Sequence, residues 1–184
     1  MNVDVLFEEM QHFLIEDYLL RQIEMSDRDD LFELHSDPSS IEYQSDVVMK
    51  SAEEVEGLIK MIHWGYDNHY FIRWGIEETK SHKLIGIFSM HHIDIRNNNA
   101  QFGYVLNANY RGRGIASHIL DEMSKKFLTQ ELFNRIELTI HPENLASIRT
   151  AEKAGYEREG ISKKCVLNTR TGTYDDRLIM SRLR

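Results

Sequence analysis

Residues 101–116, QFGYVLNANYRGRGIA, decide the fold class of this chain. An apolar and aromatic stretch runs into a turn with Gly112 and Gly114, and an amphipathic pattern that includes Ile115 and Ile119 begins directly after the turn. Such a unit presents backbone N–H groups at a helix N-terminus, where the helix dipole also favours an anion. Since glycine allows positive φ and close approach of the backbone, the turn suits a pyrophosphate. On glycine spacing alone, an ordinary strand-to-helix turn fits equally well.

The residues and the position of this turn disfavour two other phosphate-binding folds. It lacks the Lys-Ser/Thr ending of a P-loop, which makes hydrolysis of a nucleoside triphosphate a poor interpretation. It also follows three predicted strands in the middle of the chain, whereas a dinucleotide fold places its glycine turn in an early βαβ unit. A dinucleotide-binding domain is therefore only a weak alternative.

Around this segment, hydrophobic periodicity predicts an α/β fold with a mixed sheet. The runs at 70–78, 84–95 and 100–107 predict a three-stranded antiparallel meander, because they are apolar, aromatic and β-branched and are joined by short polar links. The other expected strands are at 17–23, 134–140, 156–167 and 174–183.

Capping signals place the helices. Ser26 is the expected N-cap of a helix over 26–35, and Ser51 opens a second one with a capping box to Glu54. A third helix of about four turns follows the glycine turn. A fourth runs from near Asn144 to Lys153, with Gly155 as its C-cap and Ser147 on the same side of its first turn as Asn144.

These motifs together resemble the GNAT family of N-acetyltransferases. Arg111-x-x-Gly114-x-Ala116 is similar to the family's acyl-CoA pyrophosphate loop. The run from Asn144 to Gly160, followed by Tyr174-Asp175, resembles the branch that acetylates ribosomal-protein N-termini (RimJ/RimL-like). The resemblance implies one N-acetyltransferase domain over residues 1–184. Residues 1–12 would form an N-terminal extension of this domain that the resemblance does not cover.

The resemblance also implies a fold and a cosubstrate. The fold would be a single-domain α/β GNAT fold, with a mixed, mostly antiparallel sheet whose central strands splay and are flanked by helices. Acetyl-CoA would be the cosubstrate, and its pantetheine arm would pair with the strand at 100–107. The implied cofactor-binding residues are Tyr104, Val105, Leu106, Arg111, Gly112, Arg113, Gly114, Ile115, Ala116, Asn144 and Ser147.

For catalysis, the resemblance implies direct attack of a neutral amine on the thioester. A backbone N–H of Val105 or Leu106 would stabilise the oxyanion, and Ser147 would donate to the departing thiolate. The branch usually has Glu where this chain has Gln101, and an amide is no useful base.

The base is therefore open among His91, His92, Glu137 and a water relay. The imidazole pKa of about 6.5 makes either histidine a plausible base. Since neighbouring strand residues face opposite ways, at most one of them would face the site.

We expect acetylation of a primary amine, with the N-terminal α-amine of a protein as the first choice. Its pKa of about 7.7–8.0 demands less of a base than lysine does. A polyamine or an aminoglycoside is the second choice. A non-catalytic acyl-CoA-binding sensor is the rival from another class, because Gln101 replaces the expected Glu.

Charge and composition bound the remaining possibilities. The net charge is −8, and residues 1–70 hold 4 Lys and Arg against 17 Asp and Glu, a balance of −13. This opposes nucleic-acid binding and suits a cationic substrate, although a solvated acidic surface explains it too. The chain has one cysteine, Cys165, which excludes an intramolecular disulfide, and the spacing of its histidines does not match a metal-binding site.

The same features predict a cytoplasmic protein. No secretory signal and no apolar run of bilayer length are present, so no membrane association is expected. Either a monomer or a homodimer fits, because the two closing strands could pair across a dimer.

Overall fold

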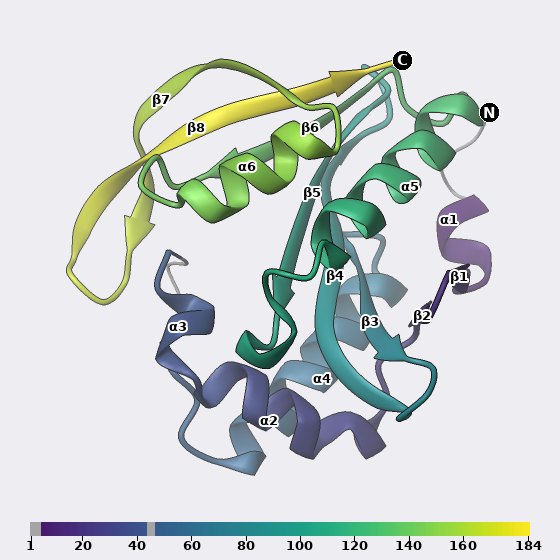
Figure 1. Ribbon diagram of the computed structural model, residues 1–184, viewed down its shortest axis with the longest axis vertical. Helices are drawn as coiled ribbons and strands as arrows, with labels where there is room; N and C mark the ends of the chain where they lie inside the picture. Colours follow the sequence, from purple (N-terminus) through teal and green to yellow (C-terminus); the bar gives the residue numbers. More distant parts are fainter. Residues whose placement is uncertain (1–4, 44–46) are drawn as a thin grey trace.

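In the computed structural model, which describes residues 5–43 and 47–184, one eight-stranded sheet carries helices on both faces (Figure 1). The strands are β1 (Phe13–Ile15), β2 (Tyr18–Arg21), β3 (Ile72–Glu78), β4 (Lys83–Asp94), β5 (Asn99–Leu106), β6 (Arg135–Ile140), β7 (Glu157–Asn168) and β8 (Thr173–Leu183). The α-helices are α1 (Val5–Glu8), α2 (Arg28–Ser36), α3 (Pro38–Ile41), α4 (Ala52–Asp67), α5 (Ile115–Thr129) and α6 (Leu145–Lys153). Two 3-10 turns span Met25–Asp27 and Ala108–Tyr110.

The sheet confirms the predicted mixed, mostly antiparallel architecture. Its strand order is β1-β2-β3-β4-β5-β6-β8-β7, and every pairing is antiparallel except that of β5 with β6. That parallel pairing covers only Asn99–Gln101 against Arg135–Glu137, after which the two strands separate. The predicted splay of the central strands is thus present, and Figure 1 shows β6 and β8 turning away from β5.

Successive residues of β5 face opposite sides of the sheet, so alternate side chains pack into the core cluster on one face or the other. Phe102 and Leu106 belong to the large core cluster with Phe127 of α5. Val105 packs instead against the cluster formed with helices α2 and α4, which includes Ile87 of β4. Residues 101, 103 and 105 therefore face away from α5.

The N-terminal region differs from the expectation in two places. Strand β2 confirms the predicted strand at 17–23, but it forms a hairpin with β1, which was not predicted, and the turn residue Glu16 has a φ of +51°. Ser26 does not cap a helix: it lies in a 3-10 turn, and α2 begins one residue after Asp27. The physical reason is that the Asp27 carboxylate accepts from the Glu24 N–H and the Arg21 guanidinium, which moves the helix start beyond Ser26.

Other expected helix ends are confirmed, and one short helix was missed. The Ser51 hydroxyl accepts from the Glu54 N–H at the start of α4. The reciprocal half of the capping box is absent, because the Glu54 carboxylate accepts from the Lys50 N–H instead. Helix α3, whose Asp37 N-cap accepts from the Ser39 N–H, was not predicted.

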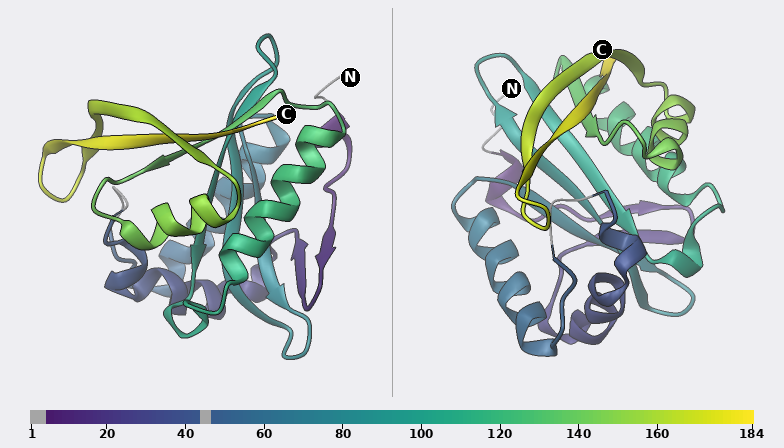
Figure 2. Two further views of the ribbon diagram at one scale, coloured as in Figure 1. Left: turned by 45° about the horizontal axis from the view of Figure 1, so that its top comes forward. Right: turned by 90° about the vertical axis from the view of Figure 1, so that its left-hand side faces the viewer.

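Of the predicted N-terminal extension, residues 1–4 lie outside the described residues, and the remainder contacts the fold. Leu6 of α1 is buried in the main core, and Phe7 stacks on His69. At the other end of the chain, β7 and β8 form a long hairpin that projects beyond the rest of the molecule (Figure 2). Among the described residues, no helix is long and apolar enough to cross a membrane.

Candidate active site

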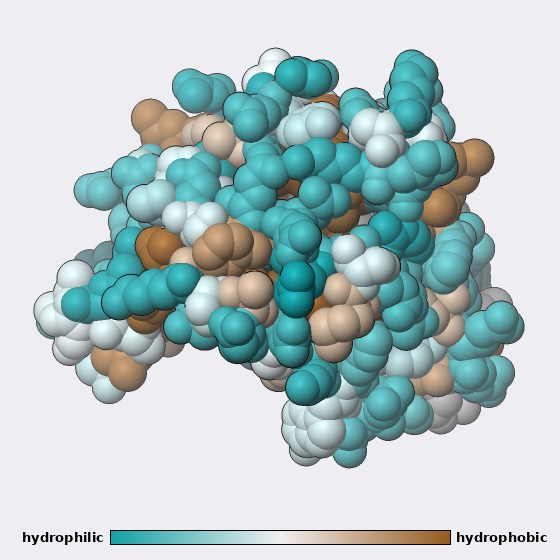
Figure 3. Space-filling view, turned by 90° about the horizontal axis from the view of Figure 1, so that it is seen from below, coloured by the Kyte–Doolittle hydropathy of each residue, from teal (hydrophilic) through white to brown (hydrophobic). Residues whose placement is uncertain are grey.

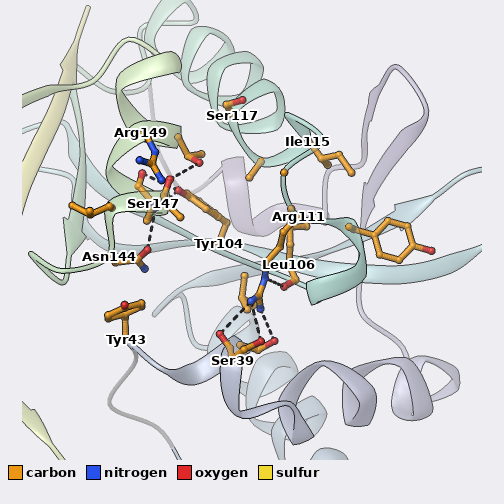
Figure 4. A pocket seen from close by; sticks show the side chains of 18 of the residues that line it. Ser39, Tyr43, Tyr104, Leu106, Arg111, Ile115, Ser117, Asn144, Ser147 and Arg149 are labelled. Atoms are coloured by element: carbon orange, nitrogen blue, oxygen red, sulfur yellow. Dashed lines mark hydrogen bonds between the residues drawn. The ribbon is translucent and has the colours of Figure 1, made fainter.

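A cleft of about 710 Å³ opens between helix α3, the end of β5 and the N-termini of α5 and α6. Viewed from below in Figure 3, the molecule is mostly hydrophilic, with apolar side chains gathered near the middle of this face. The close-up in Figure 4 shows side chains from these elements pointing into one space. The lining residues include Ser39, Ser40, Tyr43, Tyr104, Val105, Leu106, Arg111, Gly112, Gly114, Ile115, Ala116, Asn144, Ser147, Arg149 and Lys153.

The glycine turn has the backbone geometry predicted for it. Gly112 and Gly114 have φ of +75° and +82°, and no atom lies within 4 Å of where their Cβ atoms would be. Gly114 is also the N-cap of α5 and supplies no side-chain cap. The first N–H groups of α5 therefore lack partners within the helix and are free to bind an anion.

The side chain of Arg111 points away from the turn and fastens it to α3. Its Nε donates to the Leu106 carbonyl at 3.0 Å, and its two terminal nitrogens donate to the hydroxyls of Ser39 (3.0 Å) and Ser40 (2.8 Å). Figure 4 shows this guanidinium reaching toward Ser39. Arg111 thus contributes its backbone to the turn and its side chain to the link across the cleft.

Arg113 is the one predicted cofactor residue that does not line the cleft. Its guanidinium donates to the Asn109 carbonyl at 2.7 Å and lies 5.1 Å from the centre of the Tyr110 ring.

Two other exposed cations do line the cleft, Arg149 and Lys153, which are one turn apart on α6. Sequence reasoning missed them, although their i, i+4 spacing beyond Asn144 is a usable signal.

Asn144, Ser147 and Tyr104 come together at the start of α6. The Asn144 side-chain oxygen accepts from the Ser147 N–H at 3.0 Å, which confirms the predicted N-cap. The Ser147 and Tyr104 hydroxyl oxygens are 2.9 Å apart. Burial raises the pKa of Tyr104, opposed by its hydrogen bond to Ser147, so the phenol keeps its proton at neutral pH. Tyr104 can therefore donate to Ser147, leaving the serine hydroxyl free to donate into the cleft.

The edge of β5 distinguishes between the two oxyanion candidates. The N–H groups of a strand point alternately to its two edges. The Asn107 N–H donates to the Ile85 carbonyl on β4, so the N–H of Val105 also points toward β4. The N–H groups of Tyr104 and Leu106 point instead to the edge that β6 leaves open. This favours Leu106 over Val105 and adds Tyr104, which was predicted only as a partner of pantetheine.

The two candidate histidines differ in their surroundings. Burial lowers the pKa of His91 to about 4, with smaller contributions from His92 and Arg73, so the imidazole is neutral at pH 7 and a weak proton acceptor. His92 is exposed at an irregularity of β4 with a φ of +48°. The rings of the two histidines are 5.0 Å apart. These surroundings disfavour His91 as the base.

The third candidate, Glu137, lies at what we call the fork: the pair Gln101–Glu137, the last residues at which β5 and β6 are paired. The Gln101 side-chain amide donates to the Glu137 carboxylate at 3.3 Å. Among the described residues, no group of three or more His, Cys, Asp or Glu side chains could hold a metal ion.

Comparison with known proteins agrees with this geometry. Residues 17–157 match the family model described as an acetyltransferase (GNAT) domain. The chain is 28% identical over 152 residues to the uncharacterized N-acetyltransferase p20 of Bacillus licheniformis, which covers 83% of this chain and 85% of that one. It is 27% identical over 130 residues to the ribosomal-protein-serine acetyltransferase of Escherichia coli (70% and 68% covered).

A solved structure shares the fold. The spermidine N-acetyltransferase from Vibrio cholerae, in complex with CoA and spermine, superposes with a TM-score of 0.75 at 20% identity (91% and 95% covered). At this identity the likeness concerns the fold alone. The named acceptors of these proteins differ, so they do not assign the chain to the ribosomal-protein branch.

An α/β fold with a splayed sheet and a glycine turn beside the splay fits an acyl-CoA-dependent transferase. The chain belongs to the GNAT acetyltransferase family. It is an acetyl-CoA-dependent N-acetyltransferase, with acetyl-CoA as cosubstrate. Family membership thus favours an enzyme over the non-catalytic sensor that Gln101 had left open.

Proposed function

We propose that this enzyme acetylates the N-terminal α-amine of a protein or peptide, by direct attack on acetyl-CoA in a ternary complex. The observation that carries the proposal is the pair of Ser147 and Tyr104 hydroxyls beside the open edge of β5. The relative named as a ribosomal-protein-serine acetyltransferase supports a protein as the acceptor.

In the proposed mechanism, the turn at 111–116 and the first turn of α5 bind the pyrophosphate through backbone N–H groups. The N–H groups on the open edge of β5 hold the pantetheine arm and stabilise the oxyanion. The neutral amine attacks the thioester carbon, the C–N bond forms, and the C–S bond breaks as the intermediate collapses, while the nitrogen gives its extra proton to water. Ser147 donates a proton to the thiolate and is reprotonated through Tyr104 or solvent.

Acetylation of a polyamine or an aminoglycoside is the second candidate. Its support is the acidic N-terminal third, because a balance of −13 over residues 1–70 attracts polycations. An α-amine remains the first choice because it is more easily deprotonated than the amines of a polyamine, and Gln101 supplies no base.

The test is thiol release from acetyl-CoA with separate acceptors: tetrapeptides with free or blocked N-termini, spermidine and kanamycin. We expect release with the free peptides and none with their N-blocked copies. Release with spermidine or kanamycin alone would contradict the N-terminal proposal and support the second candidate. Mass spectrometry of the product identifies the acetylated nitrogen.

A further inference from the structure

The fork lies in a row of polar side chains that crosses four strands. Register places His91 of β4 beside Gln101, Gln101 beside Glu137, and Glu137 beside Ser181 of β8. Because paired residues share a face of the sheet, all four side chains lie on the face away from α5. They therefore face the side opposite the helix that backs the pyrophosphate turn.

The open edge of β5 begins next to the fork. Gly103 is two residues beyond Gln101, about 7 Å along the strand, and it faces the same side. The Ser89 hydroxyl oxygen occupies the space beside it, 2.9 Å from where a Cβ would lie. Beyond the fork β6 has left β5, so the edge at Tyr104 is open, and the Tyr104 N–H is about 10 Å along the strand from Gln101. A proton acceptor at the fork therefore suits a thioester carbonyl bound by Tyr104 rather than by Leu106, which is about 17 Å along the strand.

Glu137 is the carboxylate of the row, and its surroundings hold it in place. The Arg135 Nε donates to one of its oxygens at 2.6 Å, and the Gln101 amide donates to the other. Arg135 is also paired with Glu159, whose carboxylate accepts from the Ser181 hydroxyl. Two carboxylates against one guanidinium leave an excess negative charge here. The Glu137 side chain lies beyond the lining of the cleft and remains 24% exposed, so solvent reaches it.

We propose that Glu137 accepts the proton of the acceptor ammonium, directly or through one water, in place of a carboxylate at position 101. This rests on the proposed acetyl transfer, whatever the amine. The ammonium gives one proton to the Glu137 carboxylate, and the free amine attacks the thioester carbon. After C–N formation and C–S cleavage, the amide nitrogen loses its second proton to solvent. Gln101 orients the carboxylate by its N–H donor and offers its carbonyl oxygen to the substrate nitrogen.

The decisive experiment exchanges the two side chains of the fork. Glu137→Gln removes the carboxylate at nearly constant shape, and the double variant Gln101→Glu/Glu137→Gln returns it from the neighbouring strand with the net charge unchanged. Glu159→Gln is the matched control, because it removes another carboxylate of the same ion-pair cluster. We would measure kcat/KM with the best acceptor amine, and acetyl-CoA affinity by calorimetry, for all four proteins.

We expect Glu137→Gln to lower kcat/KM roughly 100-fold, the usual value of a positioned base, with acetyl-CoA affinity unchanged. The double variant should recover to within about tenfold of wild type, and Glu159→Gln should stay within about twofold. Equal losses in Glu137→Gln and Glu159→Gln would overturn the proposal, as would a double variant no better than Glu137→Gln.

A pH profile separates a base from a structural role. The loss in Glu137→Gln should shrink as pH rises toward the amine pKa of about 8, because the free amine then forms without help. The charged or titratable groups on this face around Glu137 are Arg135, Glu159, His91 and, beyond Ser181, Glu157. Arg135 and Glu159 keep their charge over this range. A loss independent of pH would overturn the proposal. If wild type itself releases no thiol with any amine, the proposed function fails instead.

Discussion

Strand β5 ends in the glycine turn on one side and meets β6 at the fork on the other, and these two regions are built differently. The turn uses backbone N–H groups and positive φ at Gly112 and Gly114, all within six consecutive residues. The fork uses side chains from separate strands, joined by register and by ion pairs. Binding at the turn is therefore sensitive to backbone conformation, whereas chemistry at the fork is sensitive to charge.

The largest effect should follow from Gly114→Val. Valine strains a φ of +82° and places a branched side chain where the pyrophosphate must approach the backbone. We expect acetyl-CoA affinity to fall roughly 1,000-fold, about 4 kcal/mol, by calorimetry. Gly172→Val is the matched control, because Gly172 has a φ of +71° and equally open space but lies in the β7–β8 turn. Equal affinity losses in both variants would refute the role of the turn.

Ser147→Ala should come next, and it tests chemistry without touching the turn. We expect kcat to fall roughly 100-fold while acetyl-CoA affinity is kept, because the donor to the thiolate is lost. Tyr104→Phe should give a smaller loss, since it removes only the group hydrogen-bonded to Ser147. A wild-type rate in Ser147→Ala, measured by thiol release, would eliminate this serine as the acid.

Arg111→Ala should have an intermediate effect, because this side chain links the turn to α3. Losing its bonds to Ser39, Ser40 and the Leu106 carbonyl frees both segments at the mouth of the cleft. We expect the KM for acetyl-CoA to rise about tenfold, equivalent to about 1.4 kcal/mol, with kcat changed less. Thiol release at varied acetyl-CoA measures both. A fall in kcat at unchanged KM would show that the link serves chemistry rather than binding.

The smallest effect should be on stability, in Glu159→Gln. Hydrogen bonds from Arg135, and then from Ser181, lower the pKa of Glu159 to about 2. A lowered folded-state pKa adds stability above the unfolded pKa of about 4.3, and this is lost as pH falls toward 2. At 39% exposure the gain is at most about 1 kcal/mol. Denaturant unfolding of variant and wild type should differ at pH 7 and converge near pH 2; a constant difference would contradict the ion-pair origin.

Local patterns predicted much of this fold. The meander, helix α5, the Asn144-capped helix and the two closing strands were all predicted, because each depends on periodicity or on a cap within a few residues. Strand β1 was not predicted, and the predicted start of α2 was wrong. The Asp27 carboxylate accepts hydrogen bonds from Arg21 and from the Glu24 N–H, and these contacts set the start of α2. A local sequence pattern cannot predict them, because Arg21 is itself held by an ion pair with Glu77 of β3.

The sequence by itself determined the family, the acetyl-CoA chemistry and ten of the residues that line the cleft, since the turn and the Asn144–Ser147 segment are contiguous runs. Only the tertiary structure decided that Arg111 turns to α3, that Tyr104 contacts Ser147, and that Gln101 and Glu137 share the last pair before the strands part. These contacts join residues 36 to 72 positions apart, and strand register and helix packing, rather than neighbours in the chain, bring them together.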